Sequence, residues 1–325
     1  MIKKINEITQ ILTSEVLPDI GLLIGTGGQI LFCNELSVHR EISQDWLPHL
    51  HNVLVEKLGN EDFSFTYCDG LAGIGWLYEY LSQRKMIDYD TNLFLEEFDN
   101  ALEKTLKEIM QRDNYELLYG GVGIAFYFIR RAAKKKELVT VLNQFLEDLE
   151  KISTQQKDGA IKWRSYLGDR EPQWGYNLSL SHGMSSIISV LSRMYEIEGV
   201  NKVKTEKLLR GTVQYILAQE IDKDRYGSFF PSFALEDVPE IHKSRMGWCY
   251  GDLGMASVLY QAGKALNEKT WMDKSLEIFS FAAIKRRNLE DNYIADAGLC
   301  HGTAGIGHIF YRMWWNTKLP QFKDA

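Results

Sequence analysis

The sequence predicts an all-α fold, an α/α toroid in which an inner and an outer ring of helices form one domain over residues 1–325. A short turn with glycine or another small residue three positions apart recurs six times along the chain. Apolar runs follow these turns, and amphipathic stretches lie between the runs and the next turns. No stretch resembles an interdomain linker, so we expect a single domain.

The recurring turns are recognised by a leading glycine. These glycines are Gly25, Gly70, Gly120, Gly183, Gly251 and Gly302. They stand roughly 45 to 70 residues apart, enough for two helices and two loops in each repeat. Tight turns and close helix packing explain the glycines better than phosphate binding does. None of the turns ends in the Lys-Ser/Thr pair of a phosphate-binding loop.

The residues between the turns predict two kinds of helix. Residues 91–112 place apolar side chains at helical spacing on one stripe, and 137–152 and 203–221 show the same amphipathic pattern. In contrast, residues 121–128 and 185–191 are apolar nearly all round, which is typical of a buried helix. Each repeat therefore offers one inner and one outer helix. Closing the repeats into a ring places the glycine turns at one end of the inner helices.

Two segments interrupt this alternation. Residues 155–177 and 222–247 are rich in Gly, Pro, Trp, Tyr and charge, and we expect long loops with short strands there. Long loops in a compact domain are often functional. The first leads into the turn with His182, and the second into the turn with Cys249.

Composition excludes several classes of protein. The formal net charge of -7 gives no electrostatic footprint for nucleic acid. No apolar run approaches the roughly 20 residues that a membrane span needs, and the N-terminus lacks the apolar core of a signal peptide. Four cysteines in a chain of this length make no disulfide framework. We therefore expect a soluble protein in a reducing compartment, the cytoplasm.

Metal-binding residues gather at the turns of the later repeats. One position before the leading glycine stand Ile24, Asp69, Tyr119, His182, Tyr250 and His301. Two positions before it stand Leu23, Cys68, Leu118, Ser181, Cys249 and Cys300. Thiolate and imidazole are ligands that zinc prefers, and the three ligands Cys249, Cys300 and His301 would leave one tetrahedral position open. An open position distinguishes a catalytic zinc from a structural one.

Each of these assignments has an alternative that the residues leave open. Cys249 and Cys300 could instead be small buried apolar residues, as free cysteines often are. His182 could be a core histidine bonded to a carbonyl, and Arg245 an ordinary loop arginine. Cys68 shares the ligand register, and it is either a fourth ligand or a buried thiol.

At these residues the chain resembles the lanthionine synthetase C-like (LanC-like) family of lanthipeptide cyclases. The specific marks are Arg245-Met-Gly-Trp-Cys-Tyr-Gly251 and Leu299-Cys-His-Gly-Thr-Ala-Gly305, supported by Ser181-His-Gly183. The resemblance implies an α/α toroid, usually of seven repeats where six are recognisable here. It also implies one zinc ion per chain, with Cys249, Cys300 and His301 as its ligands.

The resemblance assigns further residues to the site. His182 matches the family histidine proposed as general acid or base, and Arg245 matches an arginine lining the site. Trp248 and Tyr250 match the aromatic residues beside the first zinc ligand. Glu116 stands where the family has a catalytic aspartate, four residues before a repeat glycine, and it carries the same charge on a longer side chain.

The function implied by the resemblance is zinc-dependent cyclisation of a peptide. A cysteine thiolate adds to a dehydroalanine or dehydrobutyrine of the same peptide, giving a lanthionine or methyllanthionine thioether. The substrate is then a dehydrated precursor peptide, with a dehydratase and an exporter as candidate partners.

The sequence leaves three alternative functions open. The first is the addition of glutathione to dehydrated residues, as the wider family suggests. The second is a non-catalytic zinc scaffold that binds peptides, with Cys68 completing the metal site. The third is a glycosidase using two of the carboxylates Asp69, Glu116 and Asp296, which would leave the cysteines and His301 unexplained.

Overall fold

The computed structural model describes residues 2–39, 45–60, 63–167, 173–235, 241–288 and 290–325. It contains two compact units, Met1–Phe145 and Leu146–Ala325. Among the described residues, no helix is both long enough and apolar enough to cross a membrane. The prediction of a single domain stays a prediction.

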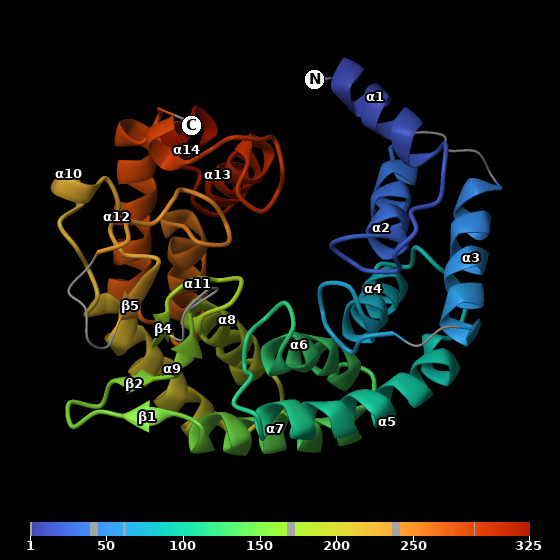
Figure 1. The fold of residues 1–325 in the computed structure, drawn as a ribbon, viewed down its shortest axis with the longest axis horizontal. Helices are drawn as coiled ribbons and strands as arrows, with labels where there is room; N and C mark the ends of the chain where they lie inside the picture. Colours follow the sequence, from blue (N-terminus) through green and yellow to red (C-terminus); the bar gives the residue numbers. More distant parts are fainter. Residues whose placement is uncertain (1, 40–44, 61–62, 168–172, 236–240, 289) are drawn as a thin grey trace. The chain divides into compact units, whose positions relative to one another are not determined.

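In the described part of the first unit, the secondary-structure elements are helices joined by turns and loops (Figure 1). Its elements are α1 (Ile2–Leu12), α2 (Thr26–Ser37), α3 (Trp46–Asn60), α4 (Leu71–Gln83), α5 (Thr91–Met110), α6 (Gly121–Ala132) and the 3₁₀ turn η1 (Lys136–Leu138). Helix α7 (Val139–Lys151) contains the boundary between the units. Within this unit α4 packs against α2, α5 and α6.

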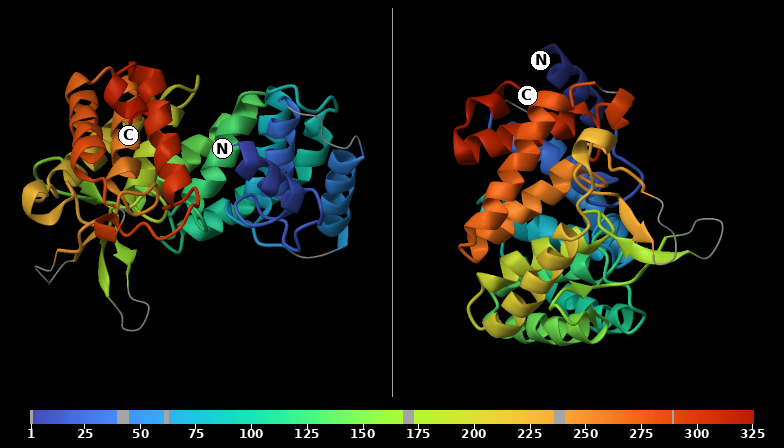
Figure 2. Two further views of the ribbon diagram at one scale, coloured as in Figure 1. Left: turned by 90° about the horizontal axis from the view of Figure 1, so that it is seen from above. Right: turned by 90° about the vertical axis from the view of Figure 1, so that its left-hand side faces the viewer.

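The second unit combines helices with two small antiparallel sheets (Figure 2). Its helices are α8 (Met184–Tyr195), α9 (Lys202–Leu217), α10 (Lys223–Tyr226), α11 (Asp252–Ala265), α12 (Lys269–Lys285), η2 (Glu290–Asn292), α13 (Thr303–Thr317) and α14 (Pro320–Lys323). Its strands are β1 (Thr154–Gln155), β2 (Ile161–Lys162), β3 (Ser165–Tyr166), β4 (Trp174–Asn177) and β5 (Phe233–Leu235), paired as β1–β2 and β3–β4–β5. The short strands lie in the two segments predicted to interrupt the helices. Residues 168–172 and 236–240 of those segments are outside the described residues.

The predicted alternation of buried and amphipathic helices is confirmed for α5, α6, α8 and α9, whereas α13 buries only a few of its side chains. Helices α6 and α8 are buried on nearly every side, whereas α5 and α9 bury one face. In the second unit α8 packs against both α9 and α11, and α11 packs against α12. An apolar surface all round requires neighbours all round, which is why the runs after the glycines become the inner helices.

Some predicted helix ends were wrong by a few residues. The stretch 203–221 ends as a helix at Leu217, because the backbone N–H of Ile221 donates to the carbonyl of Phe229 at 2.8 Å and leads the chain into the following loop. The stretch 137–152 begins with the 3₁₀ turn η1 before α7. Side-chain caps fix two of the starts, since Asp90 accepts the N–H of Asn92 and Asn201 accepts that of Lys204.

The six turns before the inner helices share one backbone arrangement, which we call the glycine turn and define as the residues from six before to three after the leading glycine. In five of them the carbonyl six before the glycine accepts the N–H of the residue after it. These pairs are Asp19–Thr26, Ser64–Leu71, Asn114–Gly121, Arg245–Asp252 and Asp296–Thr303, with N···O distances of 2.8 to 3.2 Å. Each bond satisfies one of the unpaired N–H groups at a helix start.

This arrangement explains the second small residue of the motif. A Cβ on Gly254 would lie 2.0 Å from the carbonyl oxygen of Trp248, and one on Gly305 would lie 1.9 Å from that of Leu299. Equivalent contacts at Gly73 and Gly123 would be 2.2 Å. The first turn of each helix therefore lies directly against the carbonyl three before the leading glycine. Only a minimal side chain fits there.

A buried ion-pair network joins three helices of the first unit. The Arg131 side chain on α6 is fully buried and contacts Glu79 Oε1 on α4 at 2.9 Å and Asp99 Oδ2 on α5 at 2.6 Å. Lys134 approaches the other oxygen of Glu79 at 3.1 Å, and the hydroxyl of Tyr127 donates to Asp99 Oδ1 at 2.6 Å. These contacts fix the helices in register, because each charge would otherwise be buried without a partner.

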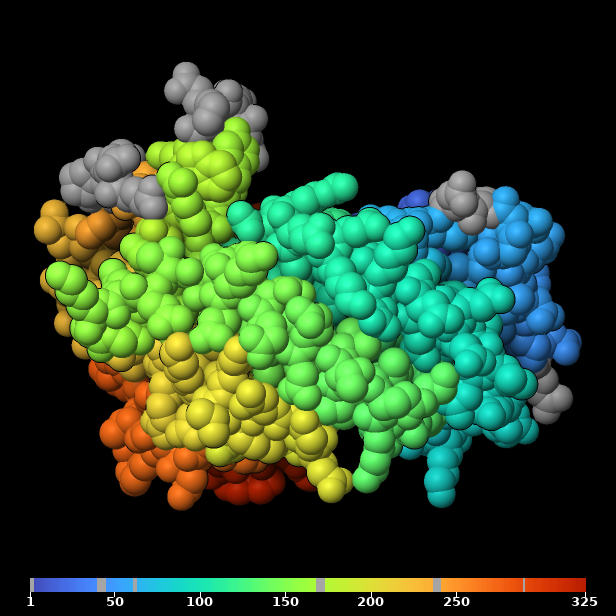
Figure 3. Space-filling model, turned by 90° about the horizontal axis from the view of Figure 1, so that it is seen from below, coloured from blue at the N-terminus to red at the C-terminus, as the bar shows by residue number. Residues whose placement is uncertain are grey.

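The β1–β2 hairpin packs on the outer helix α9. Gln214 Nε2 donates to the carbonyl of Asp158 at 2.9 Å, and a Cβ on Gly211 would lie 2.4 Å from Ile161. Figure 3 shows the hairpin in yellow-green beside the yellow surface of α9. The hairpin thereby covers a stretch of α9 that Gly211 leaves without a side chain.

Candidate metal centre

Two glycine turns of the second unit meet through their backbones. The N–H groups of Trp248 and Cys249 both point to the carbonyl oxygen of Cys300, at 2.9 and 3.3 Å. Gly247 allows this approach, because a Cβ there would lie 2.9 Å from the Cα of His301. Segments about 50 residues apart in the sequence are therefore held together by main-chain contacts as well as by any bound ion.

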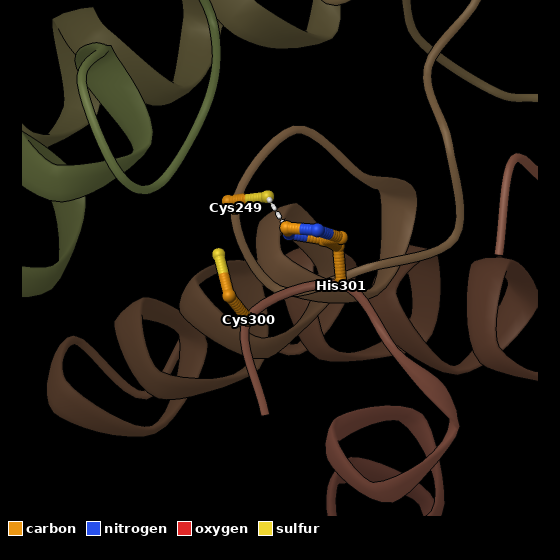
Figure 4. A group of neighbouring side chains, drawn as sticks. All are labelled: Cys249, Cys300 and His301. Atoms are coloured by element: carbon orange, nitrogen blue, oxygen red, sulfur yellow. Dashed lines mark hydrogen bonds between the residues drawn. The ribbon is translucent and has the colours of Figure 1, made fainter. Parts of the chain in front are cut away.

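Three potential metal ligands converge where these turns meet (Figure 4). The ligand atoms of Cys249, Cys300 and His301 lie within 4.8 Å of one another, and Cys249 Sγ lies 3.8 Å from His301 Nδ1. Cys249 is buried, and the other two are more accessible. Within the described part of the chain, this is the cluster of His, Cys, Asp and Glu side chains that could hold a metal ion.

The two thiols have different affinities for their protons. A hydrogen bond from Cys300 is the main cause that lowers the pKa of Cys249 to about 5, and it outweighs the effect of burial. The backbone N–H of Tyr250, the charge of Arg245 and His301 lower this pKa further. The same hydrogen bond raises the pKa of Cys300, with burial adding to the effect. Cys249 is therefore the more acidic of the two thiols.

His301 presents its two ring nitrogens to different partners. While Nδ1 faces Cys249, Nε2 lies 3.2 Å from Oδ2 of Asp296. The other oxygen of Asp296 accepts the N–H of Gly298 at 2.7 Å. The sequence alone suggested Asp296 only as a carboxylate for a glycosidase. A second role could have been inferred from its position six residues before a leading glycine. Other turns have side chains with oxygen atoms at that position, namely Asp19, Ser64, Asn114 and Asn177.

The turn with His182 adjoins the turn with Cys249. The N–H of Leu180 donates to the carbonyl of Cys249 at 2.9 Å, and the ring centroids of His182 and Tyr250 are 5.9 Å apart. Asn177 Nδ2 donates to the hydroxyl of Tyr250 at 3.2 Å, which orients that ring. Three glycine turns of the second unit thus bring His182 and Tyr250 to the side of the cysteines.

Arg245 and Trp248 belong to the turn that carries Cys249. The backbone N–H of Arg245 donates to the carbonyl of Tyr250 at 3.1 Å, and the charge of Arg245 acts on both cysteines. Trp248 is half-buried, and its N–H forms part of the contact between the turns. The role of Arg245 at the site stays a prediction.

A buried carboxylate holds this turn in place. Asp252 begins α11, and it is also buried and ion-paired with Arg286 at 2.7 Å. It accepts the N–H groups of Phe229 and Phe230 and the hydroxyl of Ser244, the neighbour of Arg245. Burial raises the pKa of Asp252, while Arg286 and these hydrogen bonds oppose the rise. The anchor fixes the chain directly before the predicted site residues.

Two predicted or alternative site residues lie in the first unit. Glu116 accepts the N–H groups of Leu118 and Tyr119 within its own turn. Cys68 is buried and interacts with Tyr119, and burial is the main cause of its raised pKa. The burial of Cys68 agrees with its interpretation as a buried thiol. The catalytic role of Glu116 and the role of Cys68 as a fourth ligand stay predictions.

Comparisons with known proteins point to one family. A sequence model of the family described as lanthionine synthetase C-like protein matches residues 18–325. The nisin biosynthesis protein NisC of Lactococcus lactis subsp. lactis is 22% identical over 322 residues, covering 92% of this chain and 75% of that protein. The glutathione S-transferase LANCL1 of Danio rerio is 24% identical over 213 residues, covering 63% of this chain and 48% of that protein.

The fold has also been seen before. The structure of nisin cyclase matches with a TM-score of 0.79 at 19% sequence identity, covering 98% of this chain and 84% of that one. This likeness confirms the predicted all-α fold of the α/α toroid class. From the match of the family over residues 18–325, the chain belongs to the lanthionine synthetase C-like protein family.

Proposed function

We propose that the protein is a zinc-dependent peptide cyclase. In this proposal it adds a cysteine thiolate to a dehydroalanine or dehydrobutyrine of the same peptide and forms a lanthionine or methyllanthionine thioether. The main support for this proposal is the convergence of two thiols and one imidazole nitrogen, whose ligand atoms lie within 4.8 Å of one another. The similarity to NisC, a nisin biosynthesis protein, supports a peptide substrate of this kind.

The donor set fits zinc. Two sulfurs and one imidazole nitrogen are among the ligands that zinc prefers, and three protein ligands leave a tetrahedral position for substrate. The hydrogen bond between the thiols means that one proton must leave before both can bind a cation. Cys249, Cys300 and Nδ1 of His301 would hold one zinc ion per chain.

The remaining site residues would move charge and protons during the addition. Zinc bound to the three ligands would supply a position at which a peptide thiol loses its proton. The sulfur then bonds to the β-carbon, the π pair of the carbon–carbon double bond moves toward the adjacent carbonyl, and a proton is added at the α-carbon. Arg245 would stabilise the negative charge on that carbonyl oxygen, and His182 would deliver the proton.

The other assigned residues would shape the site. Tyr250, held by Asn177 and close to His182, would orient the histidine and the peptide. Trp248 would provide apolar contact for the substrate. Glu116 would take the role of the family's aspartate, and a Glu116→Gln variant tests this role because it removes the charge and keeps the shape.

The first experiment measures free thiols. Zinc-loaded protein is incubated with a dehydrated peptide containing one cysteine, and the peptide is then alkylated and weighed by mass spectrometry. Cyclisation leaves the peptide mass unchanged but removes the alkylation site. We expect alkylation to disappear with the wild type, and an unchanged thiol count would reject the proposal.

Matched variants separate binding from chemistry. A His182→Asn variant should keep its zinc and lose roughly 10²- to 10⁴-fold in rate, the usual contribution of general acid catalysis. A His308→Asn variant, which changes an exposed histidine of α13, should match the wild type. A His182→Asn variant as fast as His308→Asn would remove His182 from the mechanism.

The similarity to the Danio rerio glutathione S-transferase favours a second candidate. Here the thiol comes from glutathione, and it adds to a dehydrated residue of a peptide or protein. A dehydrated peptide without cysteine, incubated with glutathione and the zinc-loaded protein, would gain the mass of one glutathione. Zinc binding without a product in either assay would instead indicate a peptide-binding scaffold.

A further inference from the structure

The side chain of Asp296 lies on the far side of His301 from the cysteines. Its Oδ2 is 3.2 Å from Nε2, whereas Nδ1 is 3.8 Å from the sulfur of Cys249. A neutral imidazole carries one N–H, and the nitrogen without hydrogen is the one that can bind a cation. A carboxylate beside Nε2 favours the hydrogen on that nitrogen, because a carboxylate only accepts hydrogen bonds.

The turn holds Asp296 in this position through two further contacts. Its Oδ1 accepts the N–H of Gly298 at 2.7 Å, and its carbonyl accepts the N–H of Thr303 at 3.1 Å. Gly302 makes room for the carboxylate, because a Cβ there would lie 2.1 Å from Oδ1. The carboxylate therefore lies across its own turn, and its second oxygen faces His301.

In comparable turns the side chain at this position also lies beside the leading glycine. The side-chain oxygens of Ser64, Asn114 and Asn177 lie where a Cβ on the leading glycine of their turns would meet them, at 2.5 to 2.6 Å. Asp296 shares that arrangement and in addition contacts His301, a candidate metal ligand of the same turn. The Asp296 carboxylate therefore has two partners, the N–H of Gly298 and the ring of His301.

We propose that Asp296 is a positioning residue that fixes the tautomer and the orientation of His301, so that Nδ1 is the nitrogen that binds the metal. The proposal rests on the proposed function, because it concerns the same metal site. Carboxylates in this position orient the imidazole and increase its basicity. Their loss typically weakens metal binding by about 10- to 100-fold.

An Asp296→Asn variant separates positioning from capping. Its amide oxygen can still accept the N–H of Gly298, so the turn keeps its cap. Its amide nitrogen cannot accept a hydrogen bond from Nε2 and instead donates to it, which favours the tautomer with hydrogen on Nδ1. An Asp291→Asn variant makes the same charge change at an exposed residue of η2 and controls for net charge.

The test is the zinc dissociation constant, measured by competition with a chromophoric chelator under reducing conditions. We expect Asp296→Asn to bind zinc about 10- to 100-fold more weakly than the wild type, while Asp291→Asn binds it equally well. Equal thermal unfolding of the metal-free variants would show that the turn is intact. Equal zinc affinity in Asp296→Asn and the wild type would overturn the proposal.

A second measurement holds even if the variant folds poorly. In the zinc-loaded wild type, the ¹⁵N shifts of His301 should identify Nδ1 as the metal-bound nitrogen and Nε2 as the protonated one. Binding through Nε2 would overturn the proposal by itself. A wild type that binds no zinc would instead reject the proposed function, so the two failures are distinguishable.

Discussion

At the scale of single residues, two glycines of α13 have opposite environments. A Cβ on Gly305 would lie 1.9 Å from the carbonyl of Leu299, whereas nothing lies within 4 Å of one on Gly307. We expect Gly305→Ala to displace the turn that carries Cys300 and His301 and to lower both stability and zinc affinity. Gly307→Ala should stabilise the helix by about 0.5–1 kcal/mol, because alanine has the higher helix propensity.

Urea unfolding and zinc titration of the two variants check this prediction. Both changes add the same methyl group to the same helix, so the difference isolates the contact with the turn. A Gly305→Ala variant with wild-type zinc affinity would mean that this close approach does not position the ligands.

The cluster of candidate metal ligands could largely be predicted from the sequence, but its surroundings could not. Equal offsets from the leading glycines grouped Cys249 with Cys300 and His301, and the structure places their ligand atoms within 4.8 Å. The contact between Asp296 and His301 depends on which way a carboxylate rotates within its turn. No residue pattern encodes that rotation, and the same holds for the burial of Asp252.

At the scale of elements, the ion pairs of Arg131 join α4, α5 and α6. An Arg131→Leu variant would remove the fully buried cation between Glu79 and Asp99 and leave these carboxylates only the partly exposed Lys134 and Lys135, at a cost of about 3–5 kcal/mol in the free energy of unfolding. Lys107→Ala, which removes an exposed pair with Glu103 on α5, should cost no more than about 0.5 kcal/mol. Urea denaturation measures both, and similar losses would contradict the structural role of the network.

The packing of α3 on α4 should depend on pH through His51. Its Nδ1 lies 3.0 Å from the hydroxyl of Tyr78, beside a surface pocket of about 400 Å³, and burial lowers its pKa. The unfolded chain therefore takes up a proton at a higher pH than the folded one does. The contribution of neutral His51 is complete above the unfolded pKa of about 6.5 and is lost as the pH falls through the lower folded value.

Thermal unfolding between pH 7.5 and pH 5 tests the sign of this effect. The wild type should lose more stability over that range than a His51→Gln variant, which no longer titrates at this position. A His39→Gln variant changes an exposed histidine and should follow the wild type. Identical pH dependence in all three proteins would show that burial of His51 does not contribute.

Helices were predictable where their own residues determine them. The stripe of residues 91–112 needs only local periodicity, and α5 follows it to Met110. The end of α9 at Leu217 was not predictable, because it depends on the bond between Ile221 and Phe229 across a loop. Long-range bonds of this kind leave no local pattern.

At the scale of the whole molecule, zinc should act as a stabilising ligand. The unfolded chain does not hold the three ligands together, so binding to the folded state shifts the equilibrium by mass action. Free zinc at 100 times its dissociation constant should add about 2.7 kcal/mol to the free energy of unfolding. A Cys300→Ser variant lacks one ligand and should gain less at the same zinc concentration.

Thermal unfolding with and without a chelator measures this gain. Equal gains in the wild type and the variant would place the stabilising metal elsewhere.

The fold class was predictable because the same sequence pattern occurs in each repeat. Six copies of the glycine turn, each with a helix after it, indicated the α/α architecture even where single copies are irregular, such as the one with Ser186 in place of the second glycine. The division into two compact units leaves no comparable mark. It reflects the density of contacts, and no linker composition accompanies it.

The shared backbone of the glycine turns bears on how such a site can arise by mutation. Cys68 and Asp69 occupy the places in their turn that Cys300 and His301 occupy in theirs, and both turns make the same two backbone bonds to the helix that follows. A single-base change in an aspartate codon yields histidine, so Asp69→His would give the chain a second Cys-His pair. Metal-binding residues can thus be gained or lost one codon at a time on a backbone that is already formed, and the architecture can persist while its chemistry changes.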